Sequence, residues 1–195
     1  MKKFILFILF LFYSFFLNAQ YINYSQFYSS PHSLNPALSG SGEFGRIGVI
    51  YRNQWPLIDN GYQFFTSWID YNLAKSNFSF GINFSNEKVG INSLSTSHVS
   101  PSLSYEINLS YDWVIRSGIQ ISYTNSNFDS QNLLFYDQFQ QNGLINPTLE
   151  NLSKFEKVNY LNLAVGLIAY SNNVWLGVSI YNLPKPNISF SDNIE

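Results

Sequence analysis

The chain has 195 residues, no cysteine, 11% charged residues and a formal net charge of −2. The lack of cysteine excludes disulfides and thiolate metal sites, and the weak charge, without any lysine or arginine cluster, excludes a nucleic-acid partner. The charged fraction lies well below the ~25% of an ordinary soluble domain, as expected where Asn, Ser, Gln and Tyr solvate the polar surfaces.

The first 19 residues have the pattern of an export signal. A basic start, Met1-Lys2-Lys3, precedes an unbroken apolar run over residues 4–17, and the small residue Ala19 follows. A membrane-spanning helix needs ~20 apolar residues, so a retained anchor is the weaker interpretation. We expect a signal peptide over residues 1–19 that is removed during export.

From Phe44 onward the chain alternates apolar and polar residues, and no long helical pattern intervenes. Residues 77–85, with the sequence NFSFGINFS, place their phenylalanines and isoleucine on one face and their polar residues on the other. This period of two is typical of strands with one apolar face. It predicts strands over residues 44–53, 61–73, 77–87, 94–108, 111–125, 157–170 and 173–182.

These strands predict an all-β fold, an antiparallel transmembrane β-barrel of the outer membrane with its apolar face toward lipid and its polar face toward the lumen. We expect a signal peptide (1–19), a periplasmic N-terminal or plug segment (20–43) and a partial barrel of about seven strands (44–195). A secreted soluble β-sandwich is the alternative, but its outer faces would carry more charge.

The connections predict an orientation. Those at 74–76, 109–110 and 171–172 are short, whereas the connection after the fifth strand is long; barrels place short turns in the periplasm and long loops outside. Aromatic residues at both strand ends are expected to form two interfacial girdles. The expected girdle residues are Tyr71, Tyr105, Tyr111, Trp113, Tyr170 and Trp175 at the turn end, and Tyr51, Trp55, Tyr62, Tyr123, Tyr160 and Tyr181 at the loop end.

Seven strands would leave two open edges, which lipid cannot solvate, and residues 191–195 are polar rather than strand-like. Single-chain barrels have an even number of strands, eight or more. We therefore expect this chain to be a fragment or a truncated copy of a longer barrel.

The sequence motifs that resemble catalytic or cofactor sites have simpler structural explanations. Residues 40–45 fit G-x-G-x-x-G but precede a strand rather than a helix, so no dinucleotide cofactor is expected. The pair His98 and Ser100 resembles a barrel phospholipase dyad, but a lumen-facing histidine is the simpler interpretation. With only two histidines and no cysteine, we expect no metal site, and no other motif calls for a cofactor.

Arginines on the polar faces are expected to lie in the lumen. Arg46, Arg52 and Arg116 are the candidates, and the expected structural role is pairing with Asp70 or Glu106 inside the barrel.

Several blocks of sequence resemble one known family in chain order. They are YSQFYSSP (24–31), LNPALSG (34–40), YRNQWP (51–56), FYDQF (135–139) and LPKPNISF (183–190). They resemble the PorP/SprF family of outer-membrane proteins linked to the type IX secretion system of Bacteroidetes. The resemblance implies a non-enzymatic barrel that assists export or surface anchoring of cargo, such as the adhesins of gliding species.

The resemblance also implies partners: other type IX secretion components, secreted cargo and outer-membrane lipid. A passive outer-membrane channel for small or apolar solutes remains the alternative function. Two blocks lack a strand period that would explain their composition, so we expect them to contact a partner or plug the lumen. Their candidate residues are Gln26, Phe27, Tyr28, Leu34, Asn35, Pro36, Arg52, Asn53, Gln54, Trp55 and Pro56.

Overall fold

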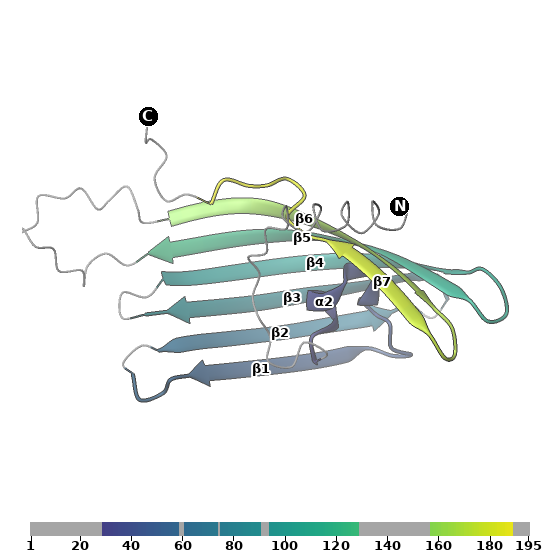
Figure 1. Ribbon diagram of the computed structural model, residues 1–195, viewed down its shortest axis with the longest axis horizontal. Helices are drawn as coiled ribbons and strands as arrows, with labels where there is room; N and C mark the ends of the chain where they lie inside the picture. The colour runs from purple at the N-terminus through teal and green to yellow at the C-terminus, as the bar shows by residue number, and fades with distance from the viewer. Residues whose placement is uncertain (1–28, 59–60, 74, 91–93, 129–156, 189–195) are drawn as a thin grey trace, which may run out of the picture.

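The computed structural model describes residues 29–58, 61–73, 75–90, 94–128 and 157–188. They form a curved sheet and a short segment that lies against it (Figure 1). The segment holds α2 (Pro31–Leu34) and the 3-10 helix η2 (Pro36–Leu38). The strands are β1 (Arg46–Gln54), β2 (Tyr62–Asn72), β3 (Phe78–Val89), β4 (Leu94–Asn108), β5 (Val114–Phe128), β6 (Lys157–Tyr170) and β7 (Trp175–Ile180).

All seven strands belong to one sheet in the order β1 to β7, and each pairs antiparallel with the next. The seven predicted strands and the all-β class are confirmed. The ends shift by a few residues. The turn after β4 is longer than predicted because the amides of Leu109 and Ser110 both donate to the carbonyl of Trp113, which delays β5 until Val114.

Pro101 lies inside β4 without ending it. It pairs in register with Ile82 of β3. On the β5 side the paired residues stop at Val99 and resume at Ser102 in the same register. Because proline has no N–H to donate, the ladder is interrupted there while the strand continues.

The sheet is apolar outside and polar inside. Its concave face, which we call the trough, buries mainly Ser, Thr, Asn, Gln, Asp and Arg side chains, with few apolar ones such as Phe64, Trp68 and Ile168. The convex face exposes Phe, Ile, Leu, Val and Tyr along every strand. A soluble domain buries its apolar residues, so this distribution is typical of a sheet solvated by lipid.

The height of the apolar band supports the same interpretation. On β4 the convex band runs from Val99 to Ile107, about 27 Å of strand at ~3.4 Å per residue. At the usual barrel tilt of ~40° this is a height of about 21 Å, close to the ~25 Å band of membrane barrels. Within the described ranges, neither short helix has the length or apolar character needed to cross a membrane.

The girdle prediction is wrong for part of its residues. Tyr71, Tyr105 and Tyr123 lie exposed on the convex face as expected. Tyr170 and Tyr181 instead face the trough, where their hydroxyls donate to Glu106 and to the carbonyls of residues 32 and 33. Residue parity decides this: in β6 the even-numbered residues face inward, which also places the predicted girdle residue Tyr160 on the trough side. Tyr181 continues the inward alternation of Ser179, which pairs with Gly166 of β6.

Candidate functional site: a segment seated in the trough

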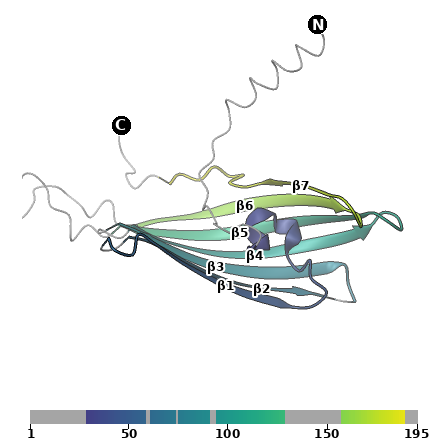
Figure 2. The ribbon, with the colours of Figure 1, turned by 60° about the horizontal axis from the view of Figure 1, so that its bottom comes forward.

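Residues 30–40, which we call the inner segment, lie in the hollow of the sheet (Figure 2). Pro31 and Pro36 each begin a short helix, where a missing N–H costs nothing. Asn35 caps the second helix by accepting a hydrogen bond from the Ala37 amide at 2.9 Å. The two helices are too short to be stable alone, so their conformation depends on contacts with the strands.

Asn35 fixes the inner segment to the last two strands. It is buried, and its amide nitrogen donates to the carbonyls of Leu167 at 3.3 Å and Val178 at 3.0 Å. On β7 the Ser179 hydroxyl donates to the Leu34 carbonyl at 3.0 Å. One side chain therefore satisfies backbone groups of η2, β6 and β7.

Glycines on three strands make room for the inner segment. A Cβ on Gly81 would lie 2.3 Å from His32, one on Gly118 2.3 Å from the Ala37 amide, and one on Gly166 1.8 Å from the Asn35 side chain. These approaches are closer than any side chain allows, which is a frequent reason for glycine inside a strand.

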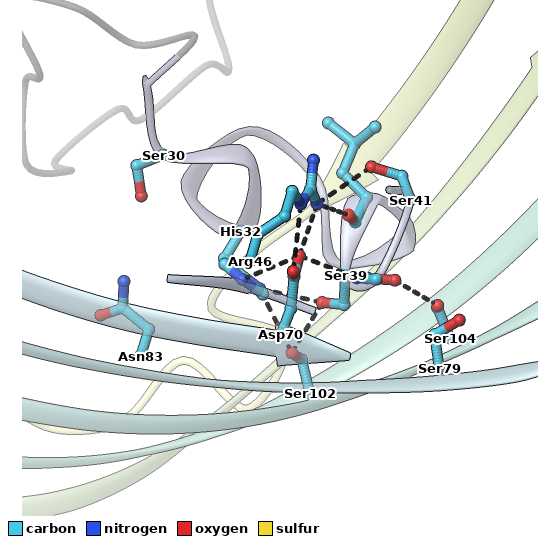
Figure 3. Close-up of polar contacts among 12 residues, drawn as sticks. Ser30, His32, Ser39, Ser41, Arg46, Asp70, Ser79, Asn83, Ser102 and Ser104 are labelled. Atoms are coloured by element: carbon cyan, nitrogen blue, oxygen red, sulfur yellow. Dashed lines mark hydrogen bonds and ion pairs between the residues drawn. The ribbon is translucent and has the colours of Figure 1, made fainter. Parts of the chain in front are cut away.

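The carboxylate of Asp70 is the centre of one polar cluster beneath the inner segment (Figure 3). It is fully buried, and it accepts hydrogen bonds from Arg46 Nε at 3.0 Å, Arg46 Nη2 at 2.5 Å and the Gly40 amide at 2.9 Å. Arg46 also donates to the Leu38 carbonyl at 3.2 Å. The predicted pairing of Arg46 with Asp70 is confirmed, and it ties β1 and β2 to the end of the inner segment.

Arg116 is the centre of a second cluster. The residue is 2% exposed, and its guanidinium donates to the carbonyls of Ala37 at 3.0 Å and Ser39 at 2.7 Å, and to Glu106 Oε2 at 2.6 Å. The Ser104 hydroxyl donates to the same Ser39 carbonyl at 2.7 Å. The predicted Arg116–Glu106 pair is confirmed, but the guanidinium also holds two carbonyls of η2 and its C-cap, which the sequence did not indicate.

His32 forms a third group of contacts between the inner segment and the sheet. Its Nδ1 shares a 3.0 Å hydrogen bond with the Ser39 hydroxyl, which is 2.7 Å from that of Ser102. Its Nε2 lies 3.6 Å from Asp70 and has no hydrogen-bond partner. Burial lowers the pKa of His32 from its ordinary 6.5 to about 4; Asp70 opposes this shift and Arg46 adds to it. The buried imidazole is therefore neutral at pH 7.

We expect the fold to weaken on mild acidification. With the folded-state pKa of His32 below its ordinary value, the unfolded chain binds more protons between pH 6.5 and about 4. Stability from neutral His32 is complete above that window and declines as the pH falls through it, by at most about 3 kcal/mol. Unfolding the protein in detergent at pH 7, 5.5 and 4.5 measures this loss.

The matched variant is His32→Gln, which cannot titrate. Its unfolding free energy should change less than that of the parent between pH 7 and 4.5. Equal losses in the two proteins would assign the acid sensitivity to other groups.

The comparisons with known proteins add a family. The family model "Type IX secretion system membrane protein PorP/SprF" matches residues 16–195. The chain belongs to the PorP/SprF family. Neither the comparison with curated proteins nor that with solved structures found a match. The sheet, with its apolar convex face and polar trough, is typical of a membrane protein. The family is a membrane component of the type IX secretion system.

The predicted contact residues of this PorP/SprF chain fall into separate places. Leu34, Asn35 and Pro36 lie in the inner segment, and Asn35 and Pro36 are buried. Gln26, Phe27 and Tyr28 lie outside the described residues. The seat in the trough is consistent with a plug, while the contact role itself stays a prediction.

The second predicted block lies at the opposite end of β1. Arg52 faces the trough above the Tyr62 ring, 5.4 Å from its centroid, and donates to Gln54. Asn53 faces outward, and Trp55 is 58% exposed in the left-handed region at φ 58°. Arg46, at the other end of β1, contacts the inner segment at Leu38, and the stretch from Arg46 to Arg52 spans about 20 Å of strand at ~3.4 Å per residue. They do not form one surface, and the partner role of the block, including the exposed Pro56, stays a prediction.

The sequence did not identify His32 as a site residue, nor Gly81, Gly118 and Gly166 as the glycines that make room for the inner segment. Isolated glycines among the inward Ser, Asn and Gln residues were the available signal, since a glycine inside a strand suggests a close backbone approach. His98 faces the trough as expected, and its Nδ1 shares a hydrogen bond with Thr124 at 2.7 Å. That contact is structural, and no group of three potential His, Cys, Asp or Glu metal ligands occurs in the described part of the chain.

Proposed function

We propose that this PorP/SprF protein is a non-enzymatic outer-membrane component of the type IX secretion system that assists export or surface anchoring of cargo, such as gliding adhesins. Its partners would be other components of the system, the cargo and outer-membrane lipid. The sheet, apolar outside and polar inside, supports placement in a membrane that barrels cross. The signal-like residues 1–19 support export to the outer membrane.

The observation that carries the proposal is that the chain's own inner segment occupies the trough. Its polar groups form hydrogen bonds with six of the seven strands, β1, β2 and β4 to β7, through Arg46, Asp70, Ser104, Arg116 and Asn35 among others. A segment held inside a barrel by hydrogen bonds can close the lumen, or present its free side to a periplasmic partner. Both roles couple the barrel to cargo passage.

The alternatives fit less well. A passive channel needs an open lumen, whereas the inner segment occupies the part of the trough around Asp70, Ser104 and Arg116. A soluble sandwich needs a second sheet over the apolar face, whereas all described strands form one sheet. Neither alternative explains the three glycines that make room for the inner segment, or the buried Arg116.

The test uses a substitution that disturbs the seat without removing any hydrogen-bonding group. Gly118→Val places a side chain where a Cβ already lies 2.3 Å from the Ala37 amide, so the inner segment cannot dock as it does now. In cells that depend on this protein for secretion, we expect surface delivery of cargo to fall at least about tenfold, because overlap with backbone cannot relax cheaply. The protein should remain in the outer-membrane fraction.

Ser117→Val is the matched control. Ser117 is the adjacent residue of β5, but it is exposed on the convex face, where an apolar side chain suits lipid. It should secrete normally. Normal secretion by both variants would remove the docked segment from the function, and loss of the Gly118→Val protein from the outer membrane would make the segment structural only.

A further inference from the structure

The convex face has a polar belt at one end of its apolar band. At the loop end, one row crosses the sheet through paired residues: Asn53, Gln63, Lys88, Ser95, Asn127 and Lys157. The row next to the band holds Asn86, Ser97, Asn125 and Asn159 on β3 to β6, and continues on β2 and β1 with Phe65 and Tyr51, which belong to the apolar band. We call these two rows the convex belt. Below it the same face continues with Phe84, Val99, Tyr123 and Leu161.

The belt is a connected surface rather than scattered polar residues. Asn86 donates to Ser97 at 2.9 Å, and Asn127 donates to Asn125 at 2.9 Å. Asn159 accepts hydrogen bonds from Asn125 at 2.5 Å and from the Tyr123 hydroxyl at 3.2 Å. Tyr123 thus joins the belt to the apolar band.

The charge of the belt has one sign. Lys88 and Lys157 are exposed on it, about 14 Å apart across three strand spacings. Among the described strand residues of these two rows there is no carboxylate, since Glu87 alternates to the trough side. An occupant of the belt is therefore expected to carry negative charge.

Among the residues that the structure describes, the opposite end of the band has no such belt. Tyr71, Phe78, Tyr105 and Ile107 continue the apolar face to the turns. The two membrane interfaces that this face meets therefore differ in chemistry. The loop end offers amides, hydroxyls and two ammonium groups above an apolar surface, and the turn end offers aromatic and aliphatic groups.

We propose that the convex belt binds the phosphorylated saccharide head group of a glycolipid in the outer leaflet, while the apolar band below it contacts the acyl chains. Amides and hydroxyls match the hydroxyl groups of sugars, and the two lysines match phosphates. Continuity with the apolar band selects an amphipathic lipid over a soluble saccharide. This inference rests on the outer-membrane placement proposed above and on the loop-out orientation predicted from the connection lengths.

Binding of purified lipopolysaccharide to the folded protein in detergent tests the inference. An interfacial lysine contributes roughly 1 kcal/mol toward an anionic lipid surface, so Lys88→Gln and Lys157→Gln should each weaken binding about fivefold, and together about thirtyfold. Lys75→Gln is the matched control, because Lys75 is exposed at the turn end, and it should bind as the parent does. Dephosphorylated lipopolysaccharide should bind the parent about as weakly as intact lipopolysaccharide binds the double variant.

Three results would overturn the inference: no binding by the parent, equal losses with Lys75→Gln, or equal affinity for phosphatidylglycerol, which would indicate a general anionic surface. Membrane fractionation distinguishes failure of the lipid-binding inference from failure of the proposed function. Protein found in the outer membrane without lipopolysaccharide binding rejects the belt alone, whereas protein absent from that membrane rejects both.

Discussion

Arg116→Met should break the contact between the sheet and the inner segment, and we expect it to lower the free energy of unfolding by about 3–5 kcal/mol. The substitution removes the guanidinium of Arg116, a residue that is 2% exposed, and leaves the Ala37 carbonyl without its donor. The Ser39 carbonyl and Glu106 each lose the guanidinium and keep only the Ser104 and Tyr170 hydroxyls, respectively. Hydrogen bonds to a charged group contribute about 1.5–3 kcal/mol each, and the loss of several gives this magnitude after the partial resolvation of Glu106, whose side chain is 30% exposed. Urea unfolding of the protein in detergent or lipid measures the loss.

Arg116→Lys is the graded variant. An ammonium keeps the charge, but it lacks the planar fork that reaches Ala37, Ser39 and Glu106 together, so an intermediate loss of roughly 1–3 kcal/mol is expected. A loss below ~1 kcal/mol for Arg116→Met would mean that the inner segment is not held by this cluster.

Ile121→Arg should block stable assembly in the membrane. Ile121 lies mid-way along β5, pairs with Leu163 and is 50% exposed on the convex face. A lipid-facing arginine near the bilayer midplane costs ~2–4 kcal/mol. The folded fraction, measured by heat-modifiable migration of membrane extracts, should fall sharply.

Ser122→Arg is the matched control for the facing assignment. Ser122 is the next residue on the same strand, half-buried on the trough side, where water and polar groups can solvate an arginine. It should assemble with a much smaller loss. Equal losses for the two variants would show that the convex face does not meet lipid.

The fold was predictable because alternation is a local signal. In residues 77–85 each apolar side chain predicts its own face, and the seven strands pair in sequence order, so neighbours along the chain are neighbours in space. Positions near strand ends were less predictable. Tyr170 was expected in a girdle from its position, but its parity and the hydrogen bond to Glu106 place it inside.

The position of the inner segment in the trough was only partly predictable. Arg116 and Glu106 are ten residues apart on adjacent antiparallel strands, and their pairing follows from the register. The contact of Asn35 with the carbonyls of Leu167 and Val178 spans more than 130 residues. Residues 30–40 have no period that selects a face, so only the three-dimensional shape of the trough, with its glycine gaps, decides where they lie.

A single engineered disulfide tests the central claim, that the inner segment is seated in the trough of a barrel in the outer membrane. The chain has no cysteine, and the hydroxyl oxygens of Ser39 and Ser102 are 2.7 Å apart, so Ser39→Cys with Ser102→Cys places two thiols within reach of an S–S bond. After oxidation of outer-membrane fractions and cleavage at Arg46, the two fragments should remain linked unless reductant is added, whereas Ser39→Cys with Ser122→Cys should not cross-link. Free thiols at positions 39 and 102 in correctly localised protein, or absence of the protein from the outer-membrane fraction, would contradict the account.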